Sequence, residues 1–168
     1  MIETRILTEI LQATEKWDDW GSLGLIDDDE PCGVHVAVMV EPFLGYILKG
    51  RKTIESRFSK PLIAPHQRIA EGDVVLLKAG PVRASFRASS VEFLELDDTE
   101  RARLARDSSD AICADEAFWQ ARENKQYATL IGISEVRHLT PIRISKNDRR
   151  RWLVLREAAH DSRQLSLL

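Results

Sequence analysis

The chain has 168 residues, of which 43% are hydrophobic and 30% are charged. This is the mixture of an ordinary globular domain and excludes collagen-like, fibrous and wholly disordered proteins. The length allows one domain with a buried core that needs no disulfide or structural metal. No apolar run approaches the roughly 20 residues of a transmembrane helix, and the acidic start is not typical of a secretory signal. The two cysteines form no C-x-x-C pair, so we expect a cytoplasmic protein with reduced thiols and no membrane partner.

The formal net charge of −3 argues, taken alone, against a nucleic-acid partner. The charges are nevertheless distributed unevenly. Residues 1–33 carry 2 basic and 9 acidic side chains, and residues 95–123 carry 4 and 9. Residues 34–94 carry 9 basic and 5 acidic side chains, and residues 124–168 carry 9 and 4. Because salt screens charges beyond about 10 Å at 0.1 M, the local excess decides the field. If the basic blocks fold together, one face of the domain is positive.

The first half of the chain predicts helices and strands separated by turn signals. Apolar residues at three- and four-residue steps predict an N-terminal amphipathic helix. Pro42 suits the first position of a second helix, and Gly50 suits the residue just past its end. Alternation after Gly50 predicts a strand with Thr53, Glu55 and Arg57 on one face. The expected elements are helix 3–20, strand 34–40, helix 42–49, strand 53–59 and strand 74–78.

The second half predicts long strands around a charged helical insert. The expected elements are strands 82–96 (one long strand or two consecutive ones) and 127–139, a helical region over 97–125, and a final strand or short helix over 149–155. A break is expected near Ser108, and Pro141 is expected to limit the strand before it. Because the strands do not alternate regularly with helices, we predict an α+β domain around a small mixed β-barrel with flanking helices.

Most familiar catalytic signatures are absent from the sequence. There is no phosphate-cradling loop, no dinucleotide fingerprint and no nucleophile elbow. The four histidines lack metal-ligand spacing, so the residues alone predict no metal site. The informative segment is Tyr46–Arg57, where a cationic helix end containing Lys52 meets the polar strand face. Side chains on that face are spaced by roughly 7 Å, and the face is either exposed or the wall of a polar cleft.

This segment resembles the signature of a known family. Residues Gly50–Arg57 read Gly-Arg-Lys-Thr-Ile-Glu-Ser-Arg, follow Pro42-Phe43-Leu44, and are similar to the motif of the ASCH domain. The later Gly72-Asp73 turn with its strand, and the run that starts at Tyr127, match the elements expected next in that family. The resemblance covers about residues 34–155.

The resemblance implies a PUA-like fold, which is a small mixed β-barrel with helices at its side, and a cleft lined by the Lys52–Arg57 motif. It divides the chain into an N-terminal helix and acidic loop (1–33), an ASCH domain (34–155) and a flexible tail (156–168). It also implies a link to RNA, so the expected partner is single-stranded RNA or a nucleotide.

The leading hypothesis is a single-strand ribonuclease. In the larger ribonuclease-type members a tyrosine precedes the motif lysine by six residues, as Tyr46 precedes Lys52. Glu55 would be the general base or would bind a divalent metal. The catalytic residues expected from the resemblance are Tyr46, Lys52, Thr53 and Glu55, and the expected substrate contacts are Arg57, Arg122 and Thr129. The basic run that contains Arg150, next to Trp152, is a further expected phosphate and base contact.

Two alternatives remain open at this stage. Family amidohydrolases that deacetylate N4-acetylcytidine carry a threonine three positions after the motif lysine, where this chain has Glu55. Thr53 offers a hydroxyl in the wrong register, and a helical carboxylate would come from Asp115 or Glu116. The other alternative is a non-catalytic module that binds RNA or a modified base.

Overall fold

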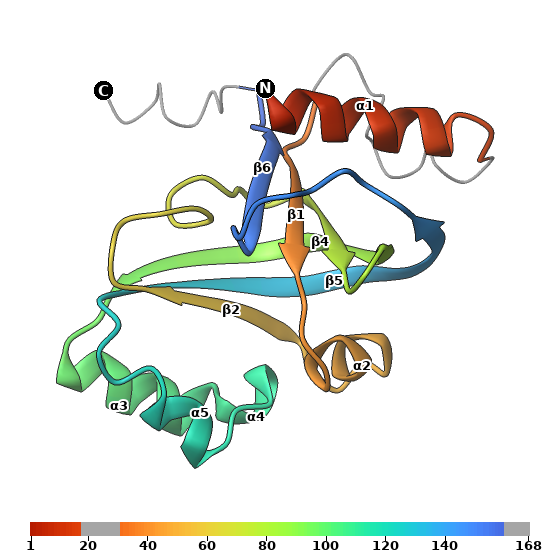
Figure 1. Ribbon diagram of the computed structural model, residues 1–168. Coiled ribbons are helices and arrows are strands. Elements are labelled where there is room, and N and C mark those ends of the chain that lie inside the picture. Colours follow the sequence, from red (N-terminus) through yellow and green to blue (C-terminus); the bar gives the residue numbers. More distant parts are fainter. Residues whose placement is uncertain (18–30, 160–168) are drawn as a thin grey trace.

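The computed structural model of the protein describes residues 1–17 and 31–159 (Figure 1). Its elements, in chain order, are α1 (Ile2–Thr14), β1 (Val34–Val38), α2 (Phe43–Leu48), β2 (Ile54–Ser59), β3 (Val74–Lys78), β4 (Val82–Glu95), α3 (Asp98–Asp107), α4 (Ser109–Ile112), α5 (Glu116–Gln120), β5 (Tyr127–Ile142) and β6 (Trp152–Arg156). Within the described ranges, no helix has the length and apolar character needed to cross a bilayer.

The six strands form one mixed sheet in the order β2-β5-β4-β3-β1-β6. Strands β1 and β3 are parallel, and the other neighbours are antiparallel. The long central pair β4 and β5 carries the curvature that bends the sheet into a half-barrel (Figure 1). The predicted α+β class and mixed sheet are therefore confirmed. The barrel is open, with β2 and β6 as its two edge strands.

Three apolar clusters hold the helices to this sheet. Ile6 and Ile10 of α1 are fully buried against β1, β3 and β6 at one end of the molecule. Inside the curve, α2 contributes Ile47 to a core that includes Phe86. At the other end, α3 to α5 pack through residues such as Leu104 on the outer face of β2 and β5 (Figure 1). Each fully buried Leu, Ile or Phe contributes about 1.5–3 kcal/mol, so the insert of helices is an integral part of the domain.

Several element boundaries differ from the sequence predictions. Helix α1 ends at Thr14 instead of continuing to residue 20, and residues 18–20 lie outside the described residues, as do 27–30 of the acidic loop and 160–168 of the tail. The expected break in the helical region is confirmed at Ser108. Strand β5 continues through Pro141 to Ile142. Since β2 pairs with β5 only as far as Gly132, this end of β5 has a free edge, where a residue without an N–H is tolerated.

Candidate nucleic-acid interface

The site lies at the gap between the two edge strands of the half-barrel, and one arginine bridges that gap. Arg57, on β2, donates from Nη2 to the carbonyl of Val38 at 3.1 Å and from Nη1 to the carbonyl of Arg151 at 3.4 Å. Its guanidinium carbon lies 5.3 Å from the ring centroid of Trp152, the first residue of β6. The side chain of Arg57 therefore links β2 to the ends of β1 and β6.

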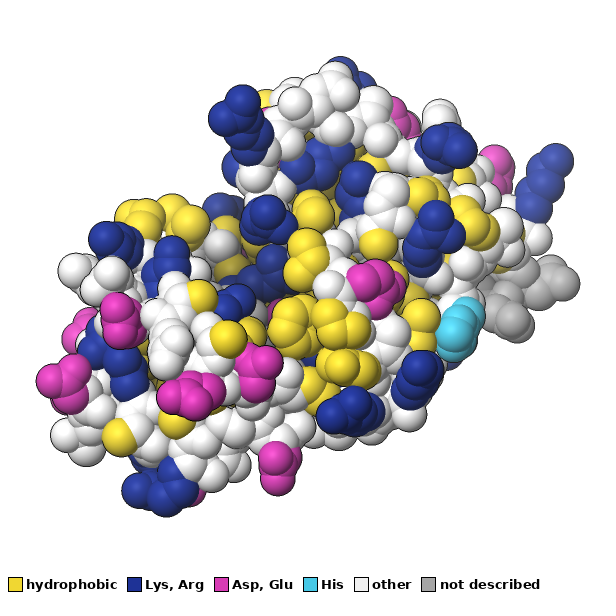
Figure 2. Space-filling view, turned by 60° about the horizontal axis from the view of Figure 1, so that its bottom comes forward, with side chains coloured by type: hydrophobic (Ala, Val, Ile, Leu, Met, Phe, Trp, Pro, Cys, Tyr) yellow, Lys and Arg dark blue, Asp and Glu magenta, His cyan; other side chains and the backbone are white. Residues whose placement is uncertain are grey.

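A cavity of about 350 Å³ opens on one side of Arg57, and we call it the cationic cavity. Its five cationic lining residues are Lys52, Arg57, Arg122, Lys125 and Arg151. Glu55 is the sole carboxylate among the described residues that line it. Figure 2 shows Lys and Arg side chains gathered around a hollow in this face of the molecule. Walls of one charge raise the local concentration of an oppositely charged ligand, so this cavity favours an anion.

Lys52 lies at the floor of the cavity and is only 3% exposed. Its Nζ donates a hydrogen bond of 2.8 Å to the carbonyl of Ile112, at the end of α4. Burial lowers the pKa of the Lys52 ammonium, and the nearby carboxylate of Glu55 opposes that shift. The insert of helices thus positions the motif lysine from behind.

Glu55 is 4% exposed and has only one of its two carboxylate oxygens satisfied. Its Oε1 accepts from the backbone N–H of Ser56 at 3.0 Å and lies 3.4 Å from Nε of Arg57. Its Oε2 is buried without a hydrogen-bond partner among the described residues. A buried acceptor without a donor costs about 1–3 kcal/mol, so Oε2 is prepared to accept a donor from a ligand.

Arg122 belongs to the insert of helices and forms a second wall of the cavity. Its guanidinium stacks on Phe118 with 3.5 Å from Cζ to the ring centroid, and Nη1 donates to the carbonyl of the same residue at 3.0 Å. Burial lowers the pKa of the Arg122 guanidinium, and Glu55 opposes the shift. This stacking fixes a planar cation at the mouth of the cavity.

A larger hollow of about 1170 Å³ lies on the other side of Arg57, and we call it the side groove. It is lined by the first turn of α1, by residues 62–68 and by most of residues 149–157. It shares Arg57, Phe58 and Arg151 with the cationic cavity, so the two hollows adjoin at these residues. Thr129 also lines the groove, although it is 1% exposed, and its Oγ1 lies 3.3 Å from Nδ1 of His66.

The structure separates the catalytic residues expected from the sequence. Lys52 and Glu55 line the cationic cavity, whereas Tyr46 and Thr53 do not. The Tyr46 ring packs edge-on against Phe43 and lies beneath the guanidinium of Arg51. Thr53 is exposed, and its backbone N–H donates to the carbonyl of Ala111.

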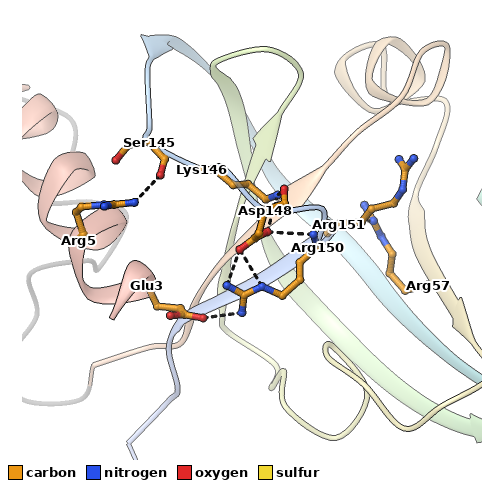
Figure 3. Close-up of polar contacts among 8 residues, drawn as sticks. All are labelled: Glu3, Arg5, Arg57, Ser145, Lys146, Asp148, Arg150 and Arg151. Carbon is orange, nitrogen blue, oxygen red and sulfur yellow. Dashed lines mark hydrogen bonds and ion pairs between the residues drawn. The ribbon is translucent and has the colours of Figure 1, made fainter.

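The expected substrate contacts are divided between the two hollows. Arg57 and Arg122 line the cavity, while Thr129, Arg150 and Trp152 line the groove. Trp152 is 5% exposed and its indole N–H donates to His35 at 3.1 Å. Arg150 is held by Asp148 and by Glu3 of α1, each at 2.7 Å (Figure 3).

Three of the lining residues, Lys125, Phe118 and His66, were not predicted from the sequence as site residues. Within the basic run 149–151, the residue named as a substrate contact was Arg150. Its neighbour Arg151 lines both hollows. Arg151 belongs to the basic run expected to contact phosphate, and the excess of basic residues over 124–168 was the signal that pointed to Lys125. Phe118 and His66 are brought to the site only by packing.

A divalent metal, which the ribonuclease hypothesis allows as a ligand of Glu55, does not fit the donors of the cavity. The described residues contain no group of three or more His, Cys, Asp or Glu side chains able to hold a metal ion. Glu55 is instead surrounded by cations, whereas hard divalent cations require several oxygen ligands. We therefore derive no step through a metal.

Comparison with known proteins identifies the fold. No family model matches the sequence, and no curated protein matches it. Among solved structures, ASCH from Zymomonas mobilis matches with a TM-score of 0.58 at 16% identity, covering 73% of this chain and 87% of that one. A serine-to-alanine variant of the Zymomonas mobilis protein matches with a TM-score of 0.57 at 14% identity, covering 80% and 93%. Its tyrosine-to-phenylalanine variant gives 0.56 at 14% identity, covering 80% and 95%. The ASCH resemblance predicted from the sequence is thus confirmed at the level of the fold.

Proposed function

Starting from the ASCH fold of this chain, we propose that the protein binds single-stranded RNA, or a nucleotide, in the cationic cavity. The observation that carries the proposal is the lining of that cavity, where five cations face one carboxylate. Phosphate groups are bound by Arg and Lys through charge-assisted hydrogen bonds. Of these cations, Arg122, Lys125 and Arg151 are at least partly exposed, whereas Lys52 is buried.

The carboxylate gives the cavity a second kind of recognition. A site for phosphate alone needs no buried acceptor, yet Oε2 of Glu55 is buried and unsatisfied. A nucleotide supplies the missing donor from a base amino group or from the ribose 2′-hydroxyl. The rings of Phe43, Phe58 and Phe118 supply apolar wall around that donor. A ribonucleotide therefore satisfies both features of the site.

The enzymatic form of this proposal is a ribonuclease that makes a 2′,3′-cyclic phosphate. Oε2 of Glu55 takes the proton of the 2′-hydroxyl, the 2′-oxygen attacks phosphorus, and the bond from phosphorus to the 5′-oxygen breaks. Water protonates the departing oxygen. Lys52 and Arg122 stabilise the negative charge that develops on the phosphorane.

Tyr46 is a positioning residue in this scheme, because its ring lies outside the cavity. Its backbone carbonyl accepts from the N–H of Lys52 at 3.0 Å and from that of Arg51 at 2.9 Å. These bonds fix the chain at the end of α2 and hence the direction of the lysine.

The test compares cleavage of a 5′-labelled single-stranded RNA by the wild type, Lys52→Ala and Lys49→Ala. Lys49 is an exposed lysine at the same helix end, so its loss changes the charge equally without altering the cavity. We expect Lys49→Ala to retain the wild-type rate and Lys52→Ala to lose at least about 100-fold. Equal rates in wild type and Lys52→Ala would refute the ribonuclease. Arg122→Gln provides a second comparison if Lys52→Ala fails to fold, and every reaction is run with and without Mg²⁺.

Two further readouts separate the alternatives. Saturable, salt-dependent binding of RNA without any product would indicate a non-catalytic module. Release of cytidine from N4-acetylcytidine would indicate an amidohydrolase instead, for which the buried Lys52 is present but the expected threonine is replaced by Glu55.

A further inference from the structure

We propose that the side groove is a second RNA-binding stretch, so that the ligand is an oligonucleotide that crosses Arg57 and Arg151 and not a single nucleotide. This inference rests on the proposed function of the cationic cavity. It extends that proposal to the path of the RNA beyond the first nucleotide and to the protein residues that bind this part of the RNA.

The first support is that the two hollows adjoin. The cavity and the groove share Arg57, Phe58 and Arg151, so a chain that leaves the cavity over these residues reaches the groove. The cavity has the volume of a small-molecule site, about 350 Å³, whereas the groove has about 1170 Å³. The nucleotides that follow one bound in the cavity can therefore lie in the groove.

The second support is the division of the basic run at 149–151. Arg150 is neutralised from both sides, by Asp148 and by Glu3, and its guanidinium points towards α1 (Figure 3). Arg149 and Arg151 are exposed, and neither side chain makes an ion pair within the described parts of the chain. Figure 3 shows Arg151 on the other side of the run, next to Arg57. Two of the three arginines are thus open to phosphate.

The third support is the surface between these charges. Leu62 and Ile63 line the groove and are 56% and 54% exposed. Exposed apolar side chains gathered in one hollow mark a binding site more often than isolated ones do. Unstacked bases of a single strand present apolar faces, which a duplex keeps covered. The combination of open arginines and apolar side chains therefore fits a single strand.

Helix α1 closes one end of this groove. Met1, Glu3 and Thr4 line it there, and the carboxylates of Glu3 and Asp148 pair with Arg150. The helix is held in place because Arg5 donates to the carbonyl of Ser145 at 2.9 Å (Figure 3). Glu9 also accepts from the backbone N–H of Ser145 at 2.9 Å. The strand is accordingly directed over Arg149 and Arg151 and away from Arg150.

The experiment measures the affinity of fluorescein-labelled 2′-O-methyl oligocytidylates of one, two, four and eight nucleotides. The protein cannot cleave them through the 2′-oxygen, and their bases keep an amino group that can donate to Glu55. For the wild type we expect affinity to rise at least tenfold between the dinucleotide and the octanucleotide. Arg149→Gln should remove most of that gain and lower the slope of log K against log salt by about 0.7, the value for one phosphate contact on a single strand. Its affinity for the dinucleotide should stay unchanged.

Arg143→Gln is the matched control, because Arg143 is an exposed arginine that lines neither hollow. This variant should bind the octanucleotide within about twofold of wild type and keep the salt slope. Arg149→Lys, which keeps the charge, should restore the affinity lost in Arg149→Gln. Urea unfolding of each variant checks that the fold is intact.

The outcomes distinguish failure of the groove proposal from failure of the proposed function of the cavity. Equal affinity for two and eight nucleotides, or equal losses in Arg149→Gln and Arg143→Gln, would overturn the groove while leaving the cavity as a nucleotide site. If no oligonucleotide binds to the wild type, the proposed function itself is wrong.

Discussion

Nε2 of His35 lies 2.8 Å from Oδ2 of Asp73, and these two polar side chains are 0% and 1% exposed. The other ring nitrogen of His35 accepts from the indole N–H of Trp152 at 3.1 Å. Because an acceptor nitrogen carries no hydrogen, Nε2 carries the imidazole proton and donates it to Asp73. Trp152 in turn faces Arg57. The network therefore connects β1, β3 and β6 to the bridge at the open side of the barrel.

We expect Asp73→Ala to cost about 3 kcal/mol or more in the free energy of unfolding. The carboxylate accepts not only from His35 but also from the backbone N–H groups of Gly33 at 2.8 Å and Ala70 at 2.9 Å. Its removal leaves three donors without their acceptor in a buried place. Urea unfolding monitored by circular dichroism measures the loss.

The control for this variant is Glu71→Ala, which changes an exposed carboxylate in the same turn. Exposed substitutions of this kind usually stay within about 0.5 kcal/mol of wild type. If Asp73→Ala also lost less than about 1 kcal/mol, Asp73 would have no structural role as the acceptor of these three donors.

Local patterns were sufficient to predict most of the fold. The period-2 alternation after Gly50, the valine-rich runs of β1 and β3, and the break at Ser108 all correspond to elements of the structure. The Gly72-Asp73 pair was recognised as a family feature, but its physical reason is tertiary. A Cβ at Gly33 would collide with the Asp73 carboxylate, so the glycine and the aspartate depend on each other across 40 residues.

The site was less predictable, because its members come from elements whose meeting depends on the whole topology. Lys52 and Glu55 are close in sequence, and both line the cavity as a cleft motif implies. The bridging role of Arg57 depends on which strands form the edges of the sheet, which periodicity does not reveal. Spacing likewise matched Tyr46 to Lys52 without revealing that the tyrosine ring packs outside the cavity.

The pH dependence of RNA binding follows from the state of Lys52. Burial lowers the pKa of its ammonium, so the positive charge is lost at a lower pH than for an exposed lysine, whose pKa is about 10.4. Affinity for an anionic ligand should therefore fall as the pH rises through that lowered pKa. Fluorescence anisotropy with a 2′-O-methyl oligonucleotide between pH 7 and pH 10 measures the fall.

Lys52→Arg isolates the contribution of this residue. An arginine stays charged over the whole range, so the part of the pH dependence that belongs to Lys52 should disappear. The folding linkage has the opposite sign: a lowered pKa in the folded state means that the unfolded chain binds more protons, so stability rises with pH in the window between the two pKa values. A wild-type affinity that is flat over this range would contradict the placement of Lys52 at the ligand.

Glu55→Gln should separate binding from cleavage. The substitution removes the one carboxylate that lines the cavity among the described residues and keeps an oxygen for the Ser56 N–H. Without its negative charge the cavity repels phosphate less, so affinity for an uncleavable oligonucleotide should rise a few-fold. Cleavage of RNA should fall by about 100-fold or more, because the general base is lost.

Glu116→Gln is the matched variant, since Glu116 is an exposed carboxylate on α5 outside the cavity lining. It should leave both quantities unchanged. Unimpaired cleavage by Glu55→Gln would exclude Glu55 as the base, and weaker binding would show that the ligand needs its charge.

The attachment of α1 should depend on pH through Glu9. Hydrogen bonds from the hydroxyl and the backbone N–H of Ser145 lower the pKa of the Glu9 carboxyl. A carboxyl with a lowered pKa stabilises the folded state above its ordinary pKa of about 4.3, and that contribution is lost as the pH falls. We expect Glu9→Gln to unfold in urea with about 1 kcal/mol less stability than wild type at pH 7. At pH 3 the difference should shrink, whereas the exposed Glu15→Gln should match wild type at both. A Glu9→Gln difference as large at pH 3 as at pH 7 would mean that packing, and not the carboxylate, accounts for the effect.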